Sequence, residues 1–539
     1  MKKHLNFIVI LMIVAFALLI NVGSFGVVES SDARYAEIAR EMFASGDFIH
    51  PNLLDVHHYH KPPFTYQITA LGYWLFGVNS FAARFFLQIA VLLQLILVYA
   101  LTDLLFRNKQ TALLAAAIYI SYPIVLVSSR NLTTDAFLTT FVLWSIYSFV
   151  KYRKTGDIKN LYFFTISLAL GFLTKGPVVF IVPVFFILFF ARTEKASGSF
   201  NIHHVLAWLL FIVIASSWFV YLAWQNTDFI NYFLGRQTAD RFSKNVFDRS
   251  EPFWYFWAFA PLVGLPWLVL LPYLIKQQIK LFTKRSVYVA LLLGCLIPLI
   301  FFSISSSKRI LYILLIYGLL AILTAQLVSV VSQDKSKRIN NIIAVFSLII
   351  ALAMSGTIFL KMDMKFPVML GVFNIIVIGS ILMVYRSKKI DLKSKLMALS
   401  LITATTLVIS SSIIMSSNQL MINSPKPVTD FILKENLNNR EILVYNTRKP
   451  SIAFGLNKSI VSLYNGSRDL DRETQFETDL NWKNYLVDMR NDSEVQYLRN
   501  VMANPTVLLL YKDSLPDNLN WMLSYYKESA NLGKWTVYY

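Results

Sequence analysis

Long apolar runs separated by short polar connections occupy most of residues 5–416. A run of about 20 apolar residues is long enough to cross a lipid bilayer as a helix. The candidate runs are residues 5–26, 80–106, 111–129, 134–150, 160–174, 177–191, 204–224, 253–275, 286–303, 310–331, 339–360, 367–385 and 396–416. The pattern predicts a polytopic α-helical membrane protein with about 13 transmembrane helices.

Two apolar segments near the N-terminus need separate treatment. The segment 64–78 is short and lies between Pro63 and Asn79, so we expect an interfacial helix within an outer loop over 27–79. The first apolar run follows Lys2 and Lys3. It is longer than the apolar core of a cleaved signal peptide, which has about 7–15 residues. We therefore expect this run to be retained as the first span.

After residue 416 the chain becomes more polar and alternates between two kinds of element. Residues 441–445, 459–463, 506–511 and 535–539 have the composition of short strands. Residues 427–435, 494–503 and 518–526 have the pattern of helices. The sequence therefore predicts a transmembrane domain over 1–416 and a small α/β domain over 417–539, outside the membrane.

The distribution of basic residues supports this arrangement of spans. Short cytoplasmic loops carry an excess of Lys and Arg. Here every second connection is basic, and these connections contain Lys2, Lys3, Arg107, Lys109, Lys151, Arg153, Lys154, Lys159, Arg192, Lys195, Lys276, Lys280, Lys284, Arg285, Lys335, Lys337, Arg338, Arg386, Lys388, Lys389, Lys393 and Lys395. This places the N-terminus in the cytoplasm and, with an odd number of spans, the C-terminal domain outside it.

Composition narrows the class of protein further. The chain is 56% hydrophobic and 15% charged, whereas soluble domains have about 25% charged residues. The formal net charge is +19, but the cations lie in short clusters between apolar runs, which argues against nucleic-acid binding. Cys295 is the single cysteine, so an intramolecular disulfide is excluded.

The outer connections nevertheless contain cations that the usual loop bias does not explain. They are Arg34, Lys61, Arg130, Lys175, Arg241, Lys308 and Arg309. An anionic ligand would explain them, and phosphate is favoured because arginine offers a bidentate fork and lysine a point charge. The alternative is that each side chain reaches lipid head groups. Because carboxylates lie among these cations, we favour the ligand.

Two carboxylates, Asp32 and Asp135, lie close to apolar spans. A carboxylate at such a depth is costly unless it is paired or has a function. Either group could act as the general base for an acceptor hydroxyl or amine. The alternative is that each aspartate caps a helix, one beginning at Ala33 and the other at Ala136.

Histidines are concentrated in the same outer loop. Histidine is the commonest metal ligand, but the spacing of these four matches no tetrahedral zinc signature and no cysteine is nearby. A polar interfacial loop is the simpler interpretation, with a divalent metal as the alternative. The four residues are His50, His57, His58 and His60.

Several motifs together closely resemble one family. They are Ser31-Asp32-Ala33-Arg34-Tyr35-Ala36-Glu37-Ile38, Arg40-Glu41-Met42, Gly46-Asp47-Phe48, His60-Lys61-Pro62-Pro63, Leu75-Phe76-Gly77-Val78, Ala82-Ala83-Arg84, Thr134-Asp135-Ala136, Leu173-Thr174-Lys175-Gly176-Pro177, Arg241-Phe242, Pro252-Phe253-Trp254-Tyr255, and Phe301-Phe302-Ser303 through Lys308-Arg309 to Tyr312. In this order they resemble the lipid A 4-amino-4-deoxy-L-arabinose transferases, relatives of the dolichyl-phosphate-mannose protein mannosyltransferases. The resemblance covers roughly residues 1–330.

The resemblance implies a GT-C fold and an inverting glycosyltransferase of the bacterial inner membrane. The donor would be a sugar on a polyprenyl phosphate, and the acceptor lipid A, another glycolipid or a protein. No cofactor is required in this scheme. Residues implied to hold the donor phosphate are Arg34, Tyr59, Lys61, Lys175, Arg241, Lys308, Arg309 and Tyr312. Preorganised cations would stabilise the leaving phosphate as its charge grows.

Three departures from the family pattern bear on the chemistry. The family has an Asp-Glu pair where this chain has Ser31 and Asp32, so the base remains open between Asp32 and Asp135. His60 replaces a glutamate on which several relatives would build a metal site. Residues 237–240 replace a Glu-His sequence, so the sugar or the acceptor can differ.

A transporter or flippase of a lipid-linked sugar is the main alternative function. Such proteins often have internal repeats and spans broken by glycine or proline near the middle of the membrane. The sequence shows no internal repeat, and its unusual charges gather near one face. We therefore favour the glycosyltransferase.

Overall fold

The computed structural model describes residues 2–193, 200–240, 250–283, 286–356, 364–467, 470–512 and 514–539. The chain forms two compact units, each built from separate parts of the sequence. The helical unit comprises Met1–Ile20, His60–Phe64 and Leu87–Ile413. The second unit, called the sheet unit below, comprises Asn21–Tyr59, Thr65–Phe86 and Ile414–Tyr539.

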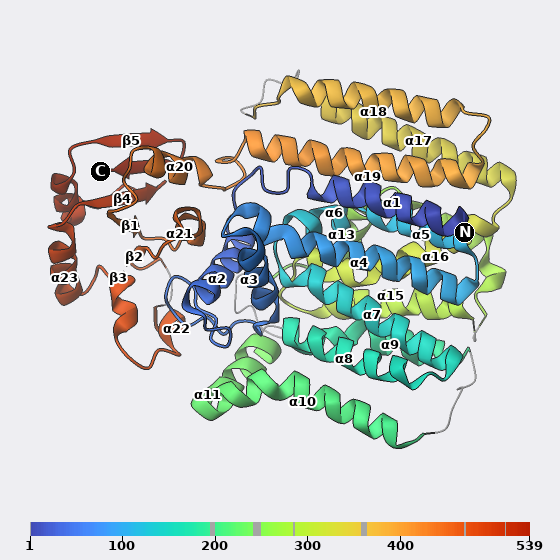
Figure 1. The fold of residues 1–539 in the computed structure, drawn as a ribbon, viewed down its shortest axis with the longest axis horizontal. Coiled ribbons are helices and arrows are strands. Elements are labelled where there is room, and N and C mark those ends of the chain that lie inside the picture. Colours follow the sequence, from blue (N-terminus) through green and yellow to red (C-terminus); the bar gives the residue numbers. More distant parts are fainter. Residues whose placement is uncertain are drawn as a thin grey trace. The chain divides into compact units, whose positions relative to one another are not determined.

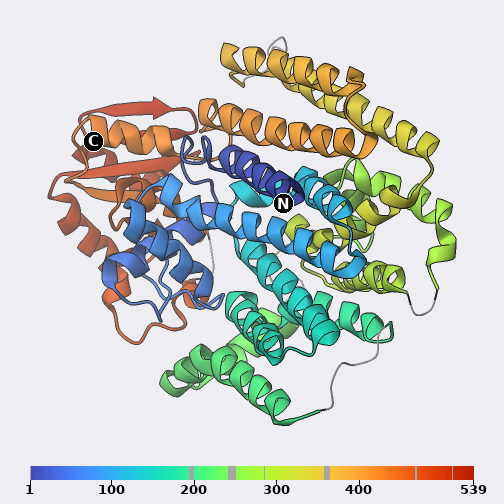
Figure 2. The ribbon, with the colours of Figure 1, turned by 45° about the vertical axis from the view of Figure 1, so that its right-hand side comes forward.

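Apolar helices build the helical unit. Helix α7 packs along α8, α8 along α10, and α9 along α15 (Figures 1 and 2). The helices are α1 (Lys2–Leu19), α4 (Ser80–Phe106), α5 (Lys109–Ser121), α6 (Pro123–Arg130), α7 (Thr134–Thr155), α8 (Ile158–Lys175), α9 (Ile181–Phe190), α10 (Ile202–Gln225), α11 (Asp228–Ile230), α13 (Tyr255–Val263), α14 (Trp267–Gln277), α15 (Val287–Ile304), α16 (Tyr317–Val330), α17 (Gln333–Gly356), α18 (Val368–Arg386) and α19 (Leu392–Ser417). Short 3-10 segments are η1 (Gly176–Phe180), η3 (Ile279–Leu281) and η4 (Ile310–Ile316), and η2 (Asn231–Asp240) is a π-helix.

Length and hydropathy select fewer spans than the sequence pattern predicted. Among the described residues, eight helices are long and apolar enough to cross a membrane. Two bent pairs raise this to ten: α5 and α6, bent by 60°, and α13 and α14, bent by 96°. Helix α1 is not counted because its apolar part is short, and α7 is not among the helices that are long and apolar enough. Residues 158–190, which contain α8 and α9, count as one span. The multi-pass helical class is confirmed, and the number 13 stays a prediction.

The run from α8 to α9 folds back on itself. A straight helix of its 33 residues would be about 50 Å long, at about 1.5 Å per residue. Yet Arg153, just before α8 in the chain, donates from Nη2 to the carbonyl of Ala191 after α9, at 3.3 Å. The two ends of the run therefore lie together, and the chain reverses at η1. The run is therefore two helices, divided where the sequence divided it, and that each of them crosses the membrane stays a prediction.

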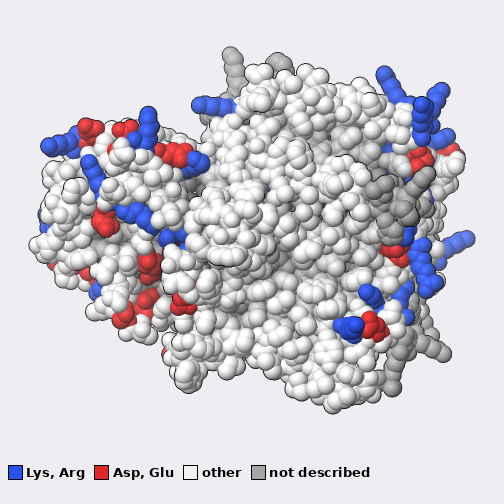
Figure 3. All heavy atoms as spheres, in the orientation of Figure 1, with Lys and Arg blue, Asp and Glu red and all other residues white. Residues whose placement is uncertain are grey.

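The basic connections gather at one end of the helical unit. Lys154 Nζ donates to the carbonyl of Leu104 at 2.9 Å, which joins the end of α7 to the end of α4. Gln110 Nε2 donates to Asp391 Oδ1 at 3.4 Å, which joins the start of α5 to the α18–α19 connection. On the face in Figure 3, the middle of the unit is almost free of charge and most Lys and Arg lie at one end. These contacts bring three of the predicted basic connections to the same end of the unit.

A six-stranded sheet organises the C-terminal part of the sheet unit. Its order is β3-β2-β1-β4-β6-β5, with β3, β2, β1 and β4 parallel and β6 and β5 antiparallel. The strands are β1 (Glu441–Tyr445), β2 (Val461–Tyr464), β3 (Leu486–Asp488), β4 (Thr506–Tyr511), β5 (Ser529–Leu532) and β6 (Trp535–Tyr538). The helices of the unit are α2 (Ser31–Ser45), α3 (Phe64–Phe76), α20 (Lys426–Lys434), α21 (Pro450–Leu456), α22 (Leu470–Thr474) and α23 (Asp492–Met502), with 3-10 segments η6 (Asn481–Asn484) and η7 (Asp517–Tyr525).

The strongest strands in the sequence are the central ones in the sheet. Strands β1 and β4 are apolar along most of their length, because parallel strands are covered on both faces. Leu443 of β1 and Leu508 of β4 pack in one core with Leu498 of α23. The sequence missed β3, which has three residues, and β5, whose side chains are partly exposed.

The structure groups the first outer loop with the C-terminal residues. The sequence placed residues 27–79 in the domain over 1–416, whereas most of them belong to the sheet unit. Helix α2 packs on α21, and Glu29 Oε1 accepts a hydrogen bond from Ser451 N at 3.0 Å. These contacts join segments more than 400 residues apart in sequence, which no local pattern predicts.

Candidate active site

The N-terminus of α7 positions Asp135. Thr133 is the N-cap residue, and its Oγ1 accepts a hydrogen bond from Asp135 N at 3.4 Å. Asp135 therefore lies inside the first turn, so the alternative in which it caps a helix from Ala136 is wrong. A carboxylate in the first turn is stabilised by the positive end of the helix dipole. Its side chain is buried and is available for a partner outside α7.

Lys175 is that partner. Asp135 Oδ1 and Lys175 Nζ form an ion pair in which each side chain is 9% exposed. Lys175 Nζ also lies 4.3 Å from the ring centroid of Tyr312, which follows the Lys308-Arg309 motif. Three residues from distant motifs thus meet at one end of the helical unit. This end is opposite the basic connections, because α7 runs from Asp135 towards Lys154.

Gly176 makes the sharp turn that places Lys175 here. Its φ is +74°, in the region that glycine adopts without a steric penalty. A Cβ at this position would lie 3.6 Å from the ring of Phe233 in η2. The Lys-Gly-Pro motif therefore ends α8, reverses the chain and brings η2 against the turn.

Segment 60–64 reaches the same end of the helical unit. Phe64 packs on Phe141 of α7, with ring centroids 5.8 Å apart. The rings of His60 and Tyr232 are 6.1 Å apart, and Tyr232 belongs to η2. Lys61 lies between these two anchored residues and is half-buried. Arg241, immediately after η2, lies outside the described residues.

Lys308 is held by backbone carbonyls. Its Nζ donates to the oxygen of Glu251 at 2.6 Å and to that of Ser305 at 2.6 Å. Burial lowers the pKa of Lys308 from its usual value. Its neighbour Arg309 is half-buried and lies just before η4, which carries Tyr312. Lys308 therefore contributes to the local structure as well as to the charge.

Asp32 lies in the first turn of α2, in the sheet unit. Its Oδ2 accepts hydrogen bonds from Val28 N at 2.9 Å and from Arg84 Nη2 at 2.5 Å, and its Oδ1 from Arg84 Nε at 3.3 Å. Both side chains are almost fully buried. Since α2 begins at Ser31, the alternative in which Asp32 caps a helix from Ala33 is wrong. In this arrangement the carboxylate holds the guanidinium of Arg84.

The structure also explains Arg130 without a ligand. This buried side chain donates to the carbonyls of Leu18 at 2.7 Å, Ala17 at 3.3 Å and Ile20 at 3.4 Å. These groups are at the C-terminus of α1, where carbonyls lack intrahelical partners and a cation is favourable. Arg130 thus anchors the first helix, and the sequence interpretation of it as an unexplained outer cation is corrected.

The remaining predicted residues of the outer loop lie in the sheet unit. Tyr59 is buried and stacks on His57, with centroids 5.2 Å apart, and also contacts Phe476. His57 Nδ1 lies 2.6 Å from Asn52 Oδ1, and His58 is buried. In the described part of the chain, no group of three or more His, Cys, Asp or Glu side chains is arranged to hold a metal ion. Arg34, another predicted site residue, lies in α2 and is half-buried.

Comparisons with known proteins agree with the motifs. The model of the dolichyl-phosphate-mannose-protein mannosyltransferase family matches residues 4–233. An undecaprenyl phosphate-alpha-4-amino-4-deoxy-L-arabinose arabinosyl transferase of Proteus mirabilis is 33% identical over 325 residues, which are 59% of this chain and 59% of that protein. A protein of the same description from Pectobacterium carotovorum is 29% identical over 333 residues, or 60% of each chain. The curated relatives are therefore matched over less than two thirds of their length.

The fold comparison extends over the whole chain. The crystal structure of ArnT from Cupriavidus metallidurans bound to undecaprenyl phosphate has a TM-score of 0.78 to this structure. The identity is 18%, and the match covers 99% of this chain and 98% of that one. This chain is similar to the aminoarabinose transferases in sequence and in fold. The GT-C fold that the sequence motifs implied is confirmed.

The charged motifs of the sequence did not reveal a buried acidic network in α2. Arg40 pairs with Glu37, Nη2 to Oε1 at 2.6 Å. Glu41 accepts hydrogen bonds from the backbone N–H groups of Leu54 at 2.6 Å and Asp55 at 3.2 Å. Both of those residues have positive φ, so Glu41 holds a strained turn in the outer loop. The sequence does contain a signal for this network, because three charged residues lie within five positions of α2.

We expect Glu41 to make stability depend on pH. Burial, together with the neighbouring Glu37, raises the pKa of Glu41 well above its usual value. The folded state therefore retains a proton that the unfolded state releases, and stability falls as the pH rises above about 4, by up to about 1.4 kcal/mol per pH unit. Thermal unfolding of Glu41→Gln should show a weaker fall than the wild type. The control Glu435→Gln changes an exposed glutamate and should keep the pH dependence of the wild type. If the stability of Glu41→Gln falls with pH as steeply as that of the wild type, the prediction is contradicted.

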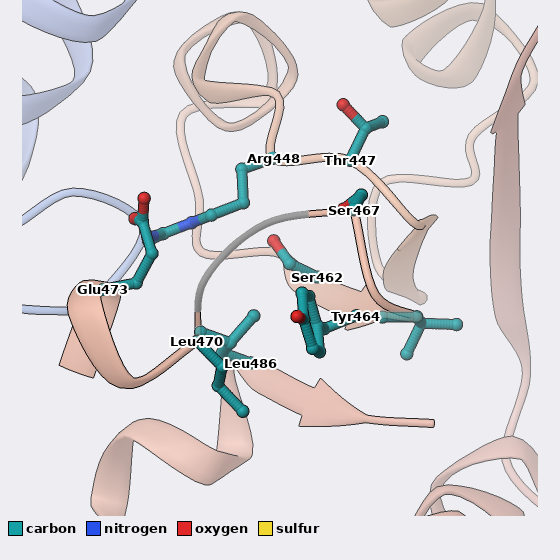
Figure 4. Close-up of a pocket in the computed structure, with 9 residues that line it drawn as sticks. Thr447, Arg448, Ser462, Tyr464, Ser467, Leu470, Glu473 and Leu486 are labelled. Atoms are coloured by element: carbon teal, nitrogen blue, oxygen red, sulfur yellow. The ribbon is translucent and has the colours of Figure 1, made fainter. Parts of the chain in front are cut away.

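A small cavity lies beside strands β1, β2 and β3 (Figure 4). Arg448 extends across its edge, with Nη1 2.5 Å from Glu473 Oε2 and Nη2 bonded to the carbonyl of Leu53. Thr447, Ser462 and the ring of Tyr464 also line it. Since the arginine already joins the outer loop to α22, its main role here is to hold that loop in the sheet unit.

Proposed function

We propose that this chain is an integral membrane glycosyltransferase that transfers a sugar from a polyprenyl phosphate to an acceptor outside the cytoplasm. The observation that carries the proposal is the buried Asp135–Lys175 pair beside Tyr312. Ion pairs at the ends of apolar spans are expensive to bury and often mark functional sites. The curated relatives named above, which are described as undecaprenyl phosphate aminoarabinose transferases, support the same donor chemistry.

The reaction is a single displacement with inversion at the sugar C1. An acceptor hydroxyl or amine forms the new bond to C1 while the bond from C1 to the phosphate oxygen breaks. The polyprenyl phosphate leaves, and the acceptor proton passes to a carboxylate. Lys175 stabilises the charge that grows on the leaving phosphate, so it favours the transition state over the ground state.

The geometry favours Asp135 over Asp32 as the base. Among the described residues Asp135 pairs with Lys175, at a site where segment 60–64, η2 and Tyr312 also meet. Asp32 accepts hydrogen bonds from Val28 N and from both Nε and Nη2 of Arg84 in the sheet unit. A carboxylate whose lone pairs are engaged in this way is a poor proton acceptor. Asp32 therefore becomes a structural residue in this proposal.

The other predicted phosphate-binding residues keep that role as part of the proposal. Lys61, Arg309 and Tyr312 belong to the helical unit and supply positive charge and a hydroxyl near Lys175 in the scheme. Arg34 and Tyr59 belong to the sheet unit, and Arg241 lies outside the described residues, so their role is proposed from the family motifs alone. Lys308 is the weakest member, because its amine is already held by two carbonyls. A cytoplasmic N-terminus, which the basic connections predict, is also proposed, and the acceptor stays open between lipid A, another glycolipid and a protein.

Lys175→Gln is the direct test of the proposed function. Transfer from a polyprenyl-phosphate sugar should fall by about 10²–10³-fold, because one preorganised charge at the leaving group is lost. Purified protein is assayed by mass spectrometry of the acceptor, with and without a chelator, and we expect the chelator to leave transfer intact. Lys159→Gln, an exposed residue at the opposite end of α8, is the control. Undiminished transfer by Lys175→Gln would refute the role, and movement of an unmodified lipid-linked sugar across vesicles without transfer would favour the transporter.

A further inference from the structure

A buried glutamine of α4 is bonded to the first turns of α7, the helix that carries Asp135. Gln94 Nε2 donates to the carbonyl of Ala136 at 2.6 Å and to Thr140 Oγ1 at 3.0 Å. Ala136 is the residue next to Asp135, and Thr140 lies one turn further along the same helix. The Thr140 hydroxyl in turn donates to the carbonyl of Ala90 in α4 at 3.1 Å. The backbone turn that holds the proposed base is therefore tied to α4 by directional bonds.

Tyr119 of α5 fixes the orientation of this amide. Its hydroxyl donates to Gln94 Oε1 at 2.6 Å. A backbone carbonyl can only accept, so Gln94 must present its NH2 group to Ala136 and its oxygen to the tyrosine. Gln94 and Tyr119 are each 0% exposed. Both donors and the oxygen of the amide thus have partners on α5 and α7, within the helical unit.

These bonds give α7 a fixed register against its neighbours. Apolar packing between helices is non-directional, whereas hydrogen bonds specify the rotation and the height of a helix. Asp135 meets Lys175 at the end of α8, so the geometry of this ion pair depends on where α7 is held. A misplacement of about 1 Å can lower the rate of an enzyme about 100-fold. Hydrogen bonds between membrane helices add only modest stability, so placement is the main consequence of this amide.

We propose that Gln94 is a positioning residue for sugar transfer, which holds Asp135 at the distance and angle that proton transfer requires. It acts through the backbone of α7 rather than by contact with the substrate. Tyr119 supports it by orienting the amide. This inference rests on the proposed function, in which Asp135 is the base.

Gln94→Met tests the proposal, because methionine keeps the length of the side chain and removes the amide. The assay uses the purified full-length protein and a polyprenyl-phosphate sugar. The value of kcat should fall about 10–100-fold while KM for the donor is unchanged. The acidic limb of the rate profile should remain, since Asp135 is still present.

Gln88→Met is the matched control. Gln88 lies in the same helix and is also 0% exposed. Its Nε2 donates to the carbonyl of Ser129 at 2.6 Å, and its Oε1 accepts from Arg130 Nη1 at 3.2 Å, so it is bonded to α6 and not to α7. This variant should keep the wild-type kcat even where it lowers the unfolding temperature. Equal losses of kcat in Gln88→Met and Gln94→Met would overturn the proposal.

A double variant separates placement of Asp135 from a general loss of stability. If Gln94 acts through Asp135, adding Gln94→Met to Asp135→Asn should change the residual rate by less than about twofold, because the positioned group is already gone. A loss that multiplies in the double variant, or a wild-type kcat in Gln94→Met, overturns the proposal.

Tyr119→Phe provides the test if Gln94→Met does not fold, since it removes only a hydroxyl. Its kcat should fall about 2–10-fold, the contribution of one neutral hydrogen bond, and a wild-type kcat counts against the proposal. The wild-type rate in Asp135→Asn would instead contradict the proposed function, and this inference with it. Loss of transfer in Asp135→Asn together with a wild-type kcat in Gln94→Met contradicts this inference alone.

Discussion

Asp135→Asn is expected to lower the rate of sugar transfer by about 10²–10⁴-fold, the usual contribution of a general base. Asparagine preserves the size of the side chain but cannot accept the acceptor proton. The variant also leaves the amine of Lys175 without its ion-pair partner. The measurement is steady-state transfer from a polyprenyl-phosphate sugar to the acceptor by purified protein, with thermal unfolding recorded in parallel.

The pH dependence of transfer separates two roles for Asp135. If Asp135 is the base, the acidic limb of the rate profile belongs to it and should disappear in Asp135→Asn. If it only positions Lys175, the limb should remain while KM for the donor rises. Asp228→Asn replaces an exposed aspartate of the same unit and is the matched control. More than half of the wild-type rate in Asp135→Asn would remove this residue as the base.

Asp32→Ala is expected to destabilise the protein by about 3–5 kcal/mol, because it leaves the buried guanidinium of Arg84 without its carboxylate. Arg84 is 0% exposed and also donates to the carbonyls of Val22, Phe25 and Gly26, so it cannot move into solvent without breaking the entry to α2. Arg84→Met should have a similar effect. Unfolding in detergent, followed by heat or by denaturant, measures both changes.

A double variant and an exposed pair make this prediction specific. Asp32→Leu with Arg84→Met should recover much of the lost stability, because neither charge is then buried alone. Asp430→Ala breaks an exposed pair with Lys426 and should cost about 1 kcal/mol or less. Loss of transfer by Asp32→Ala with unchanged unfolding would instead make Asp32 the base and would contradict its structural role.

The local patterns of the sequence were sufficient for most of the helices and for the central strands. Apolar runs of membrane length predicted most of the helices, and the continuous apolar stretches at 441–445 and 506–511 predicted the two central strands of the sheet. Alternation of basic connections predicted which helix ends lie together, as the bond from Lys154 to Leu104 now shows. These features depend on whether a segment lies in lipid or in water. The hydrophobicity of neighbouring residues in the sequence shows which of the two it is.

The partners of the charged residues depended on the tertiary structure. Asp32 and Arg84 are 52 positions apart, and Asp135 and Lys175 are 40 apart, so nothing local links them. Both aspartates had the same two interpretations before the fold was known, whereas folding pairs one with a buried arginine and leaves the other beside Lys175 and Tyr312. The motifs identified charged residues that need a partner of opposite charge. They could not identify which residue that partner would be.

The sequence by itself determined that the chain is a multi-pass helical protein with a polar α/β segment, because hydrophobicity and its period act over a few residues. Only the tertiary structure decided that Arg130 anchors the end of the first helix, that the outer loop packs with residues 414–539, and that Lys175 faces Asp135. The physical reason is that a buried charge is stabilised by whatever the fold brings within a few ångströms, and this depends on the path of the whole chain.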